Sequence, residues 1–186
     1  MLVKTARVFG SIPGWLLPST GLIMAAIAFF GYAAMDTSWI RDARGMGGSP
    51  LYGKDFVQIL TRNVGAALVL YSGIATLGLT TLVGAGILAL YVGATVSLGV
   101  HSVGGGNLLA DVIWYVPFEF LGLVMAATAG FQPTAGLVQR LAFKREPATV
   151  ASFIQDTARS LGTLLIALAL IVLGAAIEAI VIHLKT

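Results

Sequence analysis

The chain has 186 residues, of which 58% are hydrophobic and 10% charged, and its mean hydropathy is +0.93. A soluble domain of this size does not need so much apolar surface, and several segments approach or exceed the ~18 apolar residues of a spanning helix. No polar stretch is long enough to form a large soluble domain, so we predict one integral membrane domain over residues 1–186. The absence of cysteine excludes disulfides, thiolate metal sites and a cysteine nucleophile.

The first predicted span covers residues 15–35. Lys4 and Arg7 precede it, but the apolar run is long enough to span and lacks a small-residue cleavage site. We therefore interpret it as a transmembrane helix and not as a cleaved signal. The polar, glycine-rich stretch 36–54 is expected to form a loop that ends at an N-capping Asp55.

Four further spans follow in chain order. They are predicted at residues 61–80, 82–100, 109–131 and 160–183. The run of three glycines within residues 102–107 predicts a tight loop before the fourth span. Pro117 is expected inside that span, Pro133 and Gly136 are expected to end it, and residues 138–149 form a basic connector.

Five spans make the expected fold an all-α membrane bundle whose termini lie on opposite sides. Lysine and arginine favour the cytoplasmic side. The N-terminus and the basic connector share one side and hold most of these residues, namely Lys4, Arg7, Arg140, Lys144, Arg145 and Arg159. We therefore predict a cytoplasmic N-terminus and an external C-terminus in a bacterial cytoplasmic membrane.

Two carboxylates lie within the predicted spans. Glu119 and Glu178 are flanked by apolar residues, and an ionisable group at bilayer depth faces protein or water and marks function by default. With the predicted topology, Glu119, Glu178 and Asn63 all fall in the outer half of the bilayer, Glu119 about ten residues, or ~15 Å, into its helix. The sequence thus predicts an outward-facing polar pocket lined by these three residues.

Small residues share the helix faces of these polar groups. Small side chains allow helices to approach closely, so we expect the faces to point inward. The predicted packing positions are Ala85, Ala89, Gly93, Gly122, Ala126 and Gly130.

The remaining charged residues favour simpler roles. The basic cluster Arg140, Lys144 and Arg145 is expected to face lipid and contact anionic headgroups. His101 and His183 lie far apart in sequence, so we expect no metal site and no other cofactor. No basic domain or motif suggests nucleic-acid binding.

Three short motifs on the last four spans are similar to those of the stage II sporulation protein M family. They are the Phe-led helix 56–63 that ends at Asn63, Glu119 followed by Gly122 and the small residues 126–130, and the sequence 175–179 around Glu178. The order and spacing of these motifs carry the resemblance over residues 56–181.

The resemblance implies a membrane protein that works within a complex. Founding members of the family are thought to be noncatalytic scaffolds for cell-wall hydrolases, and related proteins accompany bacteriocin gene sets. We therefore expect a scaffold or accessory subunit that handles a peptide or remodels the envelope. Its expected partners are membrane lipid, a peptide substrate, and another membrane protein or a second copy of the chain.

An enzymatic alternative remains open beside the scaffold. Glu119 would be a general base and Glu178 its complementary acid, while Asn63 would hydrogen-bond a peptide carbonyl or oxyanion. Such a subunit would dehydrate or epimerise a ribosomal peptide. A purely structural role is also open, in which the glutamates hydrogen-bond between helices and Asn63 caps or packs a helix.

Overall fold

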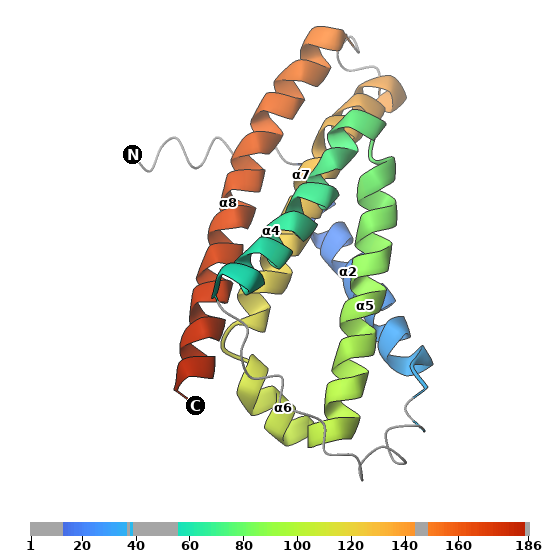
Figure 1. Ribbon diagram of the computed structural model, residues 1–186. Coiled ribbons are helices and arrows are strands. Elements are labelled where there is room, and N and C mark those ends of the chain that lie inside the picture. The colour runs from blue at the N-terminus through green and yellow to red at the C-terminus, as the bar shows by residue number, and fades with distance from the viewer. Residues whose placement is uncertain (1–12, 37, 39–55, 144–148, 185–186) are drawn as a thin grey trace.

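The computed structural model describes residues 13–36, 38, 56–143 and 149–184, and within these ranges its regular structure is entirely helical. The elements are α2 (Leu16–Ala34), α4 (Phe56–Tyr71), the 3₁₀-helix η1 (Ser72–Thr76), α5 (Leu79–Val103), α6 (Gly105–Val112), α7 (Val116–Phe143) and α8 (Val150–His183). Figure 1 shows them as an elongated bundle. Five of these segments are long and apolar enough to cross a membrane, which confirms the predicted all-α class and the number of candidate spans in the described ranges.

Helix α7 is the centre of the bundle. Of its apolar window 67% is buried, against 22–28% in the other four candidate spans. It packs along α8 and also contacts α4 and α2 (Figure 1). Glycines allow the close approach: a Cβ atom at Gly122 would lie 2.7 Å from Ile171 of α8, and one at Gly130 would collide with the Leu70 carbonyl of α4.

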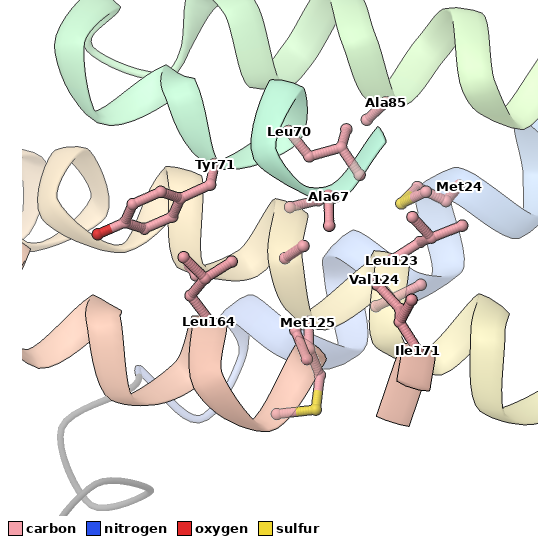
Figure 2. Close-up of a cluster of buried hydrophobic side chains, with 14 of the residues drawn as sticks. Met24, Ala67, Leu70, Tyr71, Ala85, Leu123, Val124, Met125, Leu164 and Ile171 are labelled. Carbon is pink, nitrogen blue, oxygen red and sulfur yellow. The ribbon is translucent and has the colours of Figure 1, made fainter. Parts of the chain in front are cut away.

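The apolar core takes side chains from every spanning helix. Figure 2 shows Met24 of α2, Leu70 of α4, Ala85 of α5, Leu123 of α7 and Ile171 of α8 gathered in one cluster. Lipid tails are as apolar as the interior of a helix bundle. In a membrane, therefore, close packing of side chains stabilises such a cluster, and exclusion from water does not. Small side chains are therefore as important to this core as large ones.

Helices α2 and α5 cross at a contact between backbones. The Gly93 Cα lies so close to α2 that a Cβ atom there would collide with the Ala28 carbonyl, and Gly31 is similarly close to Leu90. Ala85 and Ala89 continue the buried stripe along α5. The small-residue face expected on this span thus packs against a neighbouring helix.

The first correction to the predicted spans lies between α4 and α5. The chain reverses at Leu77 and Gly78, which have φ angles of 51° and 87°. The Gly78 amide donates to the Gly73 carbonyl, which closes the end of the helix in the manner of a left-handed cap. Thr80 therefore belongs to α5 and not to the preceding span, where the sequence analysis placed it.

The second correction concerns the glycine triplet, which was predicted to be a loop. Only Gly104 takes a positive φ, 88°, and it ends α5. The next helix starts at once, because the Leu108 amide donates to the Gly104 carbonyl. Residues 109–112, which were assigned to the fourth span, thus belong to the short, solvent- or lipid-exposed α6.

The fourth and fifth spans also differ in their limits. Helix α7 begins at Val116 with Pro117 in its first turn, where a missing amide hydrogen has no cost, and it continues through Pro133 to Phe143. Neighbouring helices bury Pro133 completely and so tolerate it inside a helix. Helix α8 begins at Val150, ten residues before the predicted start, because Thr149 and Ser152 form a capping box.

We name the two ends of the bundle by the elements found there. The α6 end holds α6, the start of α7 and the end of α8, and the η1 end holds η1, the end of α7 and the start of α8 (Figure 1). Helices α7 and α8 run in opposite directions, so the first turn of α7 lies beside the last turns of α8. This arrangement positions Glu119 and Glu178, the two glutamates of the candidate spans.

Candidate functional site

A hydrogen bond between α4 and α7 forms the centre of the candidate site. The Asn63 Nδ2 donates to the Glu119 Oε1 over 2.6 Å, and both residues are partly buried. Asn63 is two turns into α4, and Glu119 lies in the first turn of α7. A side-chain hydrogen bond of this kind links two helices that apolar packing alone would otherwise hold together.

Glu178 of α8 joins this pair. Its carboxyl group hydrogen-bonds with that of Glu119, and the two groups also interact electrostatically. Gly174, one turn earlier on α8, allows the approach, because a Cβ atom there would lie only 2.6 Å from the Glu119 Cγ. The structure thus brings the three predicted pocket residues together from three different helices.

Tyr115 is a fourth member, which was not among the predicted pocket residues. It lies in the turn between α6 and α7, and its carbonyl accepts hydrogen bonds from the Phe118 and Glu119 amides. Burial, with the nearby Glu178 and Glu119 carboxylates, raises the pKa of Tyr115 to about 12. The phenol therefore remains a proton donor at physiological pH. We call Asn63, Tyr115, Glu119 and Glu178 the glutamate cluster.

The cluster lies closer to the helix ends than predicted. The fourth span was expected to begin at residue 109, which would place Glu119 about ten residues inside it. Instead the Tyr115 amide closes a turn on the Val112 carbonyl, and α7 begins only at Val116. Glu119 is thus close to the α6 end, where the final turns of α8 carry Glu178.

The small residues predicted to pack helices lie at helix contacts. Ala126 is fully buried in α7, between Gly122 and Gly130, whose contacts with α8 and α4 are described above. Ala85, Ala89 and Gly93 are buried on α5. The close packing of α7 and α8 at Gly122 and Gly174 leads directly to the glutamate cluster.

A second polar group lies at the η1 end, and it changes the role expected for Arg140. The Arg140 side chain is only 15% exposed, and its Nη1 is 2.5 Å from the Asp156 Oδ2. Arg159 contacts the other oxygen of Asp156 at 3.4 Å. Arg140 therefore pairs with α8 and does not face lipid headgroups, contrary to expectation, whereas Lys144 and Arg145 lie outside the described residues.

Buried hydrogen bonds extend the polar group at the η1 end. The Thr163 hydroxyl donates to the Gln132 Oε1 over 3.1 Å, and the Tyr71 and Ser160 hydroxyls are 3.2 Å apart. These contacts link α8 to α7 and α4, as the glutamate cluster does at the α6 end. Buried polar groups that satisfy one another fix a unique arrangement of helices.

No group of three or more His, Cys, Asp or Glu side chains capable of holding a metal ion occurs in the described ranges. His101 contacts the Ser97 carbonyl within its own helix, with 2.8 Å between the Nδ1 and the oxygen. The side chains of the glutamate cluster offer carboxyl, carboxamide and phenol groups. These groups exchange protons and bind polar parts of a ligand or partner.

No protein-family model, curated protein or solved structure matches the chain. The glutamate cluster, with its geometry, is thus the principal basis for a functional assignment. The cluster also lies at the same end of the bundle as α6. The apolar side chains of α6, such as that of Leu109, are exposed and available to a partner.

Proposed function

We propose that the chain is a membrane-embedded, noncatalytic scaffold or accessory subunit, distantly related to the stage II sporulation protein M family. It spans a bacterial cytoplasmic membrane five times, with the N-terminus in the cytoplasm and the C-terminus outside. In this role it assembles a complex that handles a peptide or remodels the envelope. The observation that carries the proposal is the contact of Asn63 and Glu178 with Glu119 across three helices.

The geometry supports a scaffold because the polar groups satisfy each other. Glu119 accepts from Asn63, pairs with Glu178 and packs against the Gly174 backbone. Interactions of this type fix the register and orientation of helices more than they add to stability. The cluster thus holds the α6 end in one conformation.

The surface near the cluster supports a partner at the α6 end. Helix α6 has no buried residue, and the adjoining Ile113 and Trp114 are exposed. A short helix with exposed apolar side chains, located beside a rigid polar cluster, is suited to contact a second membrane protein or the membrane interface. Such a partner is engaged without any chemical change in the scaffold.

The charge distribution supports the proposed orientation. Arg140 and Arg159 lie at the η1 end, together with the sequence of the basic connector. The positive-inside rule then assigns the η1 end to the cytoplasm and the glutamate cluster to the outer half of the bilayer.

A membrane enzyme that modifies a peptide is the second candidate, and one observation favours it. Two carboxyl groups share a site with a protonated phenol, and such a set can divide acid and base roles. In this alternative Glu119 removes a proton from the peptide, and Glu178 or Tyr115 returns one to the product or leaving group. Asn63 orients the peptide carbonyl.

Affinity purification of the full chain from its native host tests both candidates. The wild type, Glu119→Gln and Glu178→Gln are compared. Glu146→Gln is the control, because it makes the same substitution at the one glutamate outside the cluster. Mass spectrometry identifies the bound proteins and any change in bound peptides. A scaffold predicts the same partner and chemically unchanged peptides in all four samples. A modified peptide that appears with the wild type and Glu146→Gln alone would contradict the scaffold and establish the enzyme.

A further inference from the structure

Arg62 is a cation inside a candidate span. Among the described residues, no carboxylate forms an ion pair with it. It lies in α4, inside the candidate span Phe56–Thr76, and its side chain is exposed. The two other arginines with described side-chain contacts inside helices, Arg140 and Arg159, both pair with Asp156. A guanidinium within a candidate span is costly unless it is paired or reaches the interface, so an anion from outside the described fold would stabilise it.

Tyr91 of α5 holds the Arg62 side chain in place. The Arg62 Nη2 donates to the Tyr91 hydroxyl, and the guanidinium carbon is 5.1 Å from the centre of the ring. This contact orients the guanidinium between the two helices but is made by a neutral residue. The remaining guanidinium donors keep the planar geometry that suits a phosphate group.

Arg62 lies near the start of its candidate span, within reach of a lipid headgroup. It lies six residues after Phe56, which is ~9 Å along the helix at the rise of an α-helix. An arginine side chain extends far enough to reach the interfacial region from such a position. The anion can therefore belong to a molecule whose remaining part lies deeper in the bilayer.

The surface between Arg62 and the η1 end is apolar and exposed. Gly65 follows Arg62 by three residues on α4, and a Cβ atom there would have no neighbour within 4 Å. Ile87, one turn before Tyr91 on the same face of α5, is 64% exposed. Farther along, Val69 of α4 meets α5 at Gly84, where a Cβ atom would lie 3.5 Å from the valine.

We propose that Arg62 and Tyr91 bind the phosphate of an anionic phospholipid, with one acyl chain over Gly65 and Ile87. The occupant is a lipid because the Arg62 guanidinium, held by Tyr91, and the exposed apolar surface at Gly65 and Ile87 follow one another along α4 and α5. A water-soluble anion would contact only the Arg62 guanidinium and would leave the apolar surface uncovered. This site is separate from the glutamate cluster and depends on membrane insertion, not on whether the protein is a scaffold or an enzyme.

Native mass spectrometry of the full chain in mild detergent tests the site. Phosphatidylglycerol and phosphatidylcholine are added separately, and the variants are Arg62→Gln, Arg62→Lys and Gly65→Leu. Arg159→Gln removes the same charge at the η1 end and is the matched control. We expect phosphatidylglycerol to bind the wild type and Arg159→Gln equally, and Arg62→Gln to bind about tenfold more weakly, because one charge-assisted contact is lost.

Two further measurements separate lipid from other anions. Gly65→Leu is expected to weaken phosphatidylglycerol binding severalfold without a change of charge, and glycerol phosphate is expected not to displace the lipid. Arg62→Lys retains the charge and is expected to bind better than Arg62→Gln, which provides a comparison if the latter folds poorly. Unchanged binding in both Arg62→Gln and Gly65→Leu would overturn the proposal, as would an equal loss in Arg159→Gln. Displacement by glycerol phosphate would assign the site to a soluble anion instead.

Discussion

The Asn63 carboxamide donates to the Glu119 carboxyl group over 2.6 Å and so connects the first half of α4 to the first turn of α7. The two residues are 56 positions apart in the chain. Glu178 approaches the same carboxyl group from α8. One side chain of the central helix therefore fixes the positions of two neighbouring helices at the α6 end.

Removal of the Asn63 carboxamide is expected to destabilise the bundle. Asn63→Ala leaves a partly buried carboxyl oxygen without its donor, which costs about 1–3 kcal/mol. The control is Asn107→Ala, because the Asn107 Nδ2 donates to a carbonyl in an exposed position. Thermal unfolding in detergent measures both variants. Equal midpoints for Asn63→Ala and the wild type would show that the bond adds no stability.

A methyl group at Gly174 is expected to disrupt the glutamate cluster. In Gly174→Ala the new Cβ would lie 2.6 Å from the Glu119 Cγ, so α7 and α8 must separate or Glu119 must move. Overpacking of this kind costs roughly 1–3 kcal/mol. Gly65→Ala is the matched control, since its Cβ meets no atom within 4 Å and alanine favours helix. A loss of thermal stability in Gly65→Ala as large as that in Gly174→Ala would contradict this explanation.

The arginines that contact Asp156 are expected to differ in importance. Arg140→Gln leaves the mostly buried Asp156 with only the longer contact to Arg159, and we expect a loss of about 2–4 kcal/mol. The Arg159 side chain is 46% exposed, so Arg159→Gln is expected to cost less than about 1 kcal/mol. Chemical denaturation in detergent compares the two. The opposite order would show that Arg159 is the main partner of Asp156.

Single cysteines provide a direct test of the proposed topology, because the chain has none of its own. Ser38→Cys follows α2, and Ala151→Cys is in the first turn of α8 at the η1 end. Both positions are exposed. A membrane-impermeant thiol reagent applied to intact cells is expected to label position 38 and not position 151. Permeabilised cells are the control, in which both should react. The reverse pattern in intact cells would invert the topology.

The number of spans was predictable from sequence, but their limits were not. Hydropathy is a sum over neighbouring residues, so the five apolar segments can be recognised without knowledge of their contacts. Helix ends depend on individual backbone angles and caps. At Gly104 a positive φ ends α5, yet the following glycines enter α6, and at Pro133 the buried surroundings allow α7 to continue.

The members of the glutamate cluster were also recognisable, with one exception. Glu119, Glu178 and Asn63 stood out because polar residues are rare in apolar segments and because small residues share their helix faces. Tyr115 could not be identified in the same way, since aromatic residues are common at membrane interfaces. Its place in the cluster follows from the turn before α7, where burial and the charges of Glu178 and Glu119 raise the pKa of its phenol.

The sequence by itself determined the class of protein, the five apolar segments and the inward faces of the helices, because composition and helical periodicity are local properties. Only the tertiary structure decided which polar groups meet. The opposite directions of α7 and α8 bring Glu119 to Glu178 at one end and Arg140 to Asp156 at the other. A hydrogen bond or an ion pair requires atoms a few ångströms apart, and the packing of distant segments alone establishes that proximity.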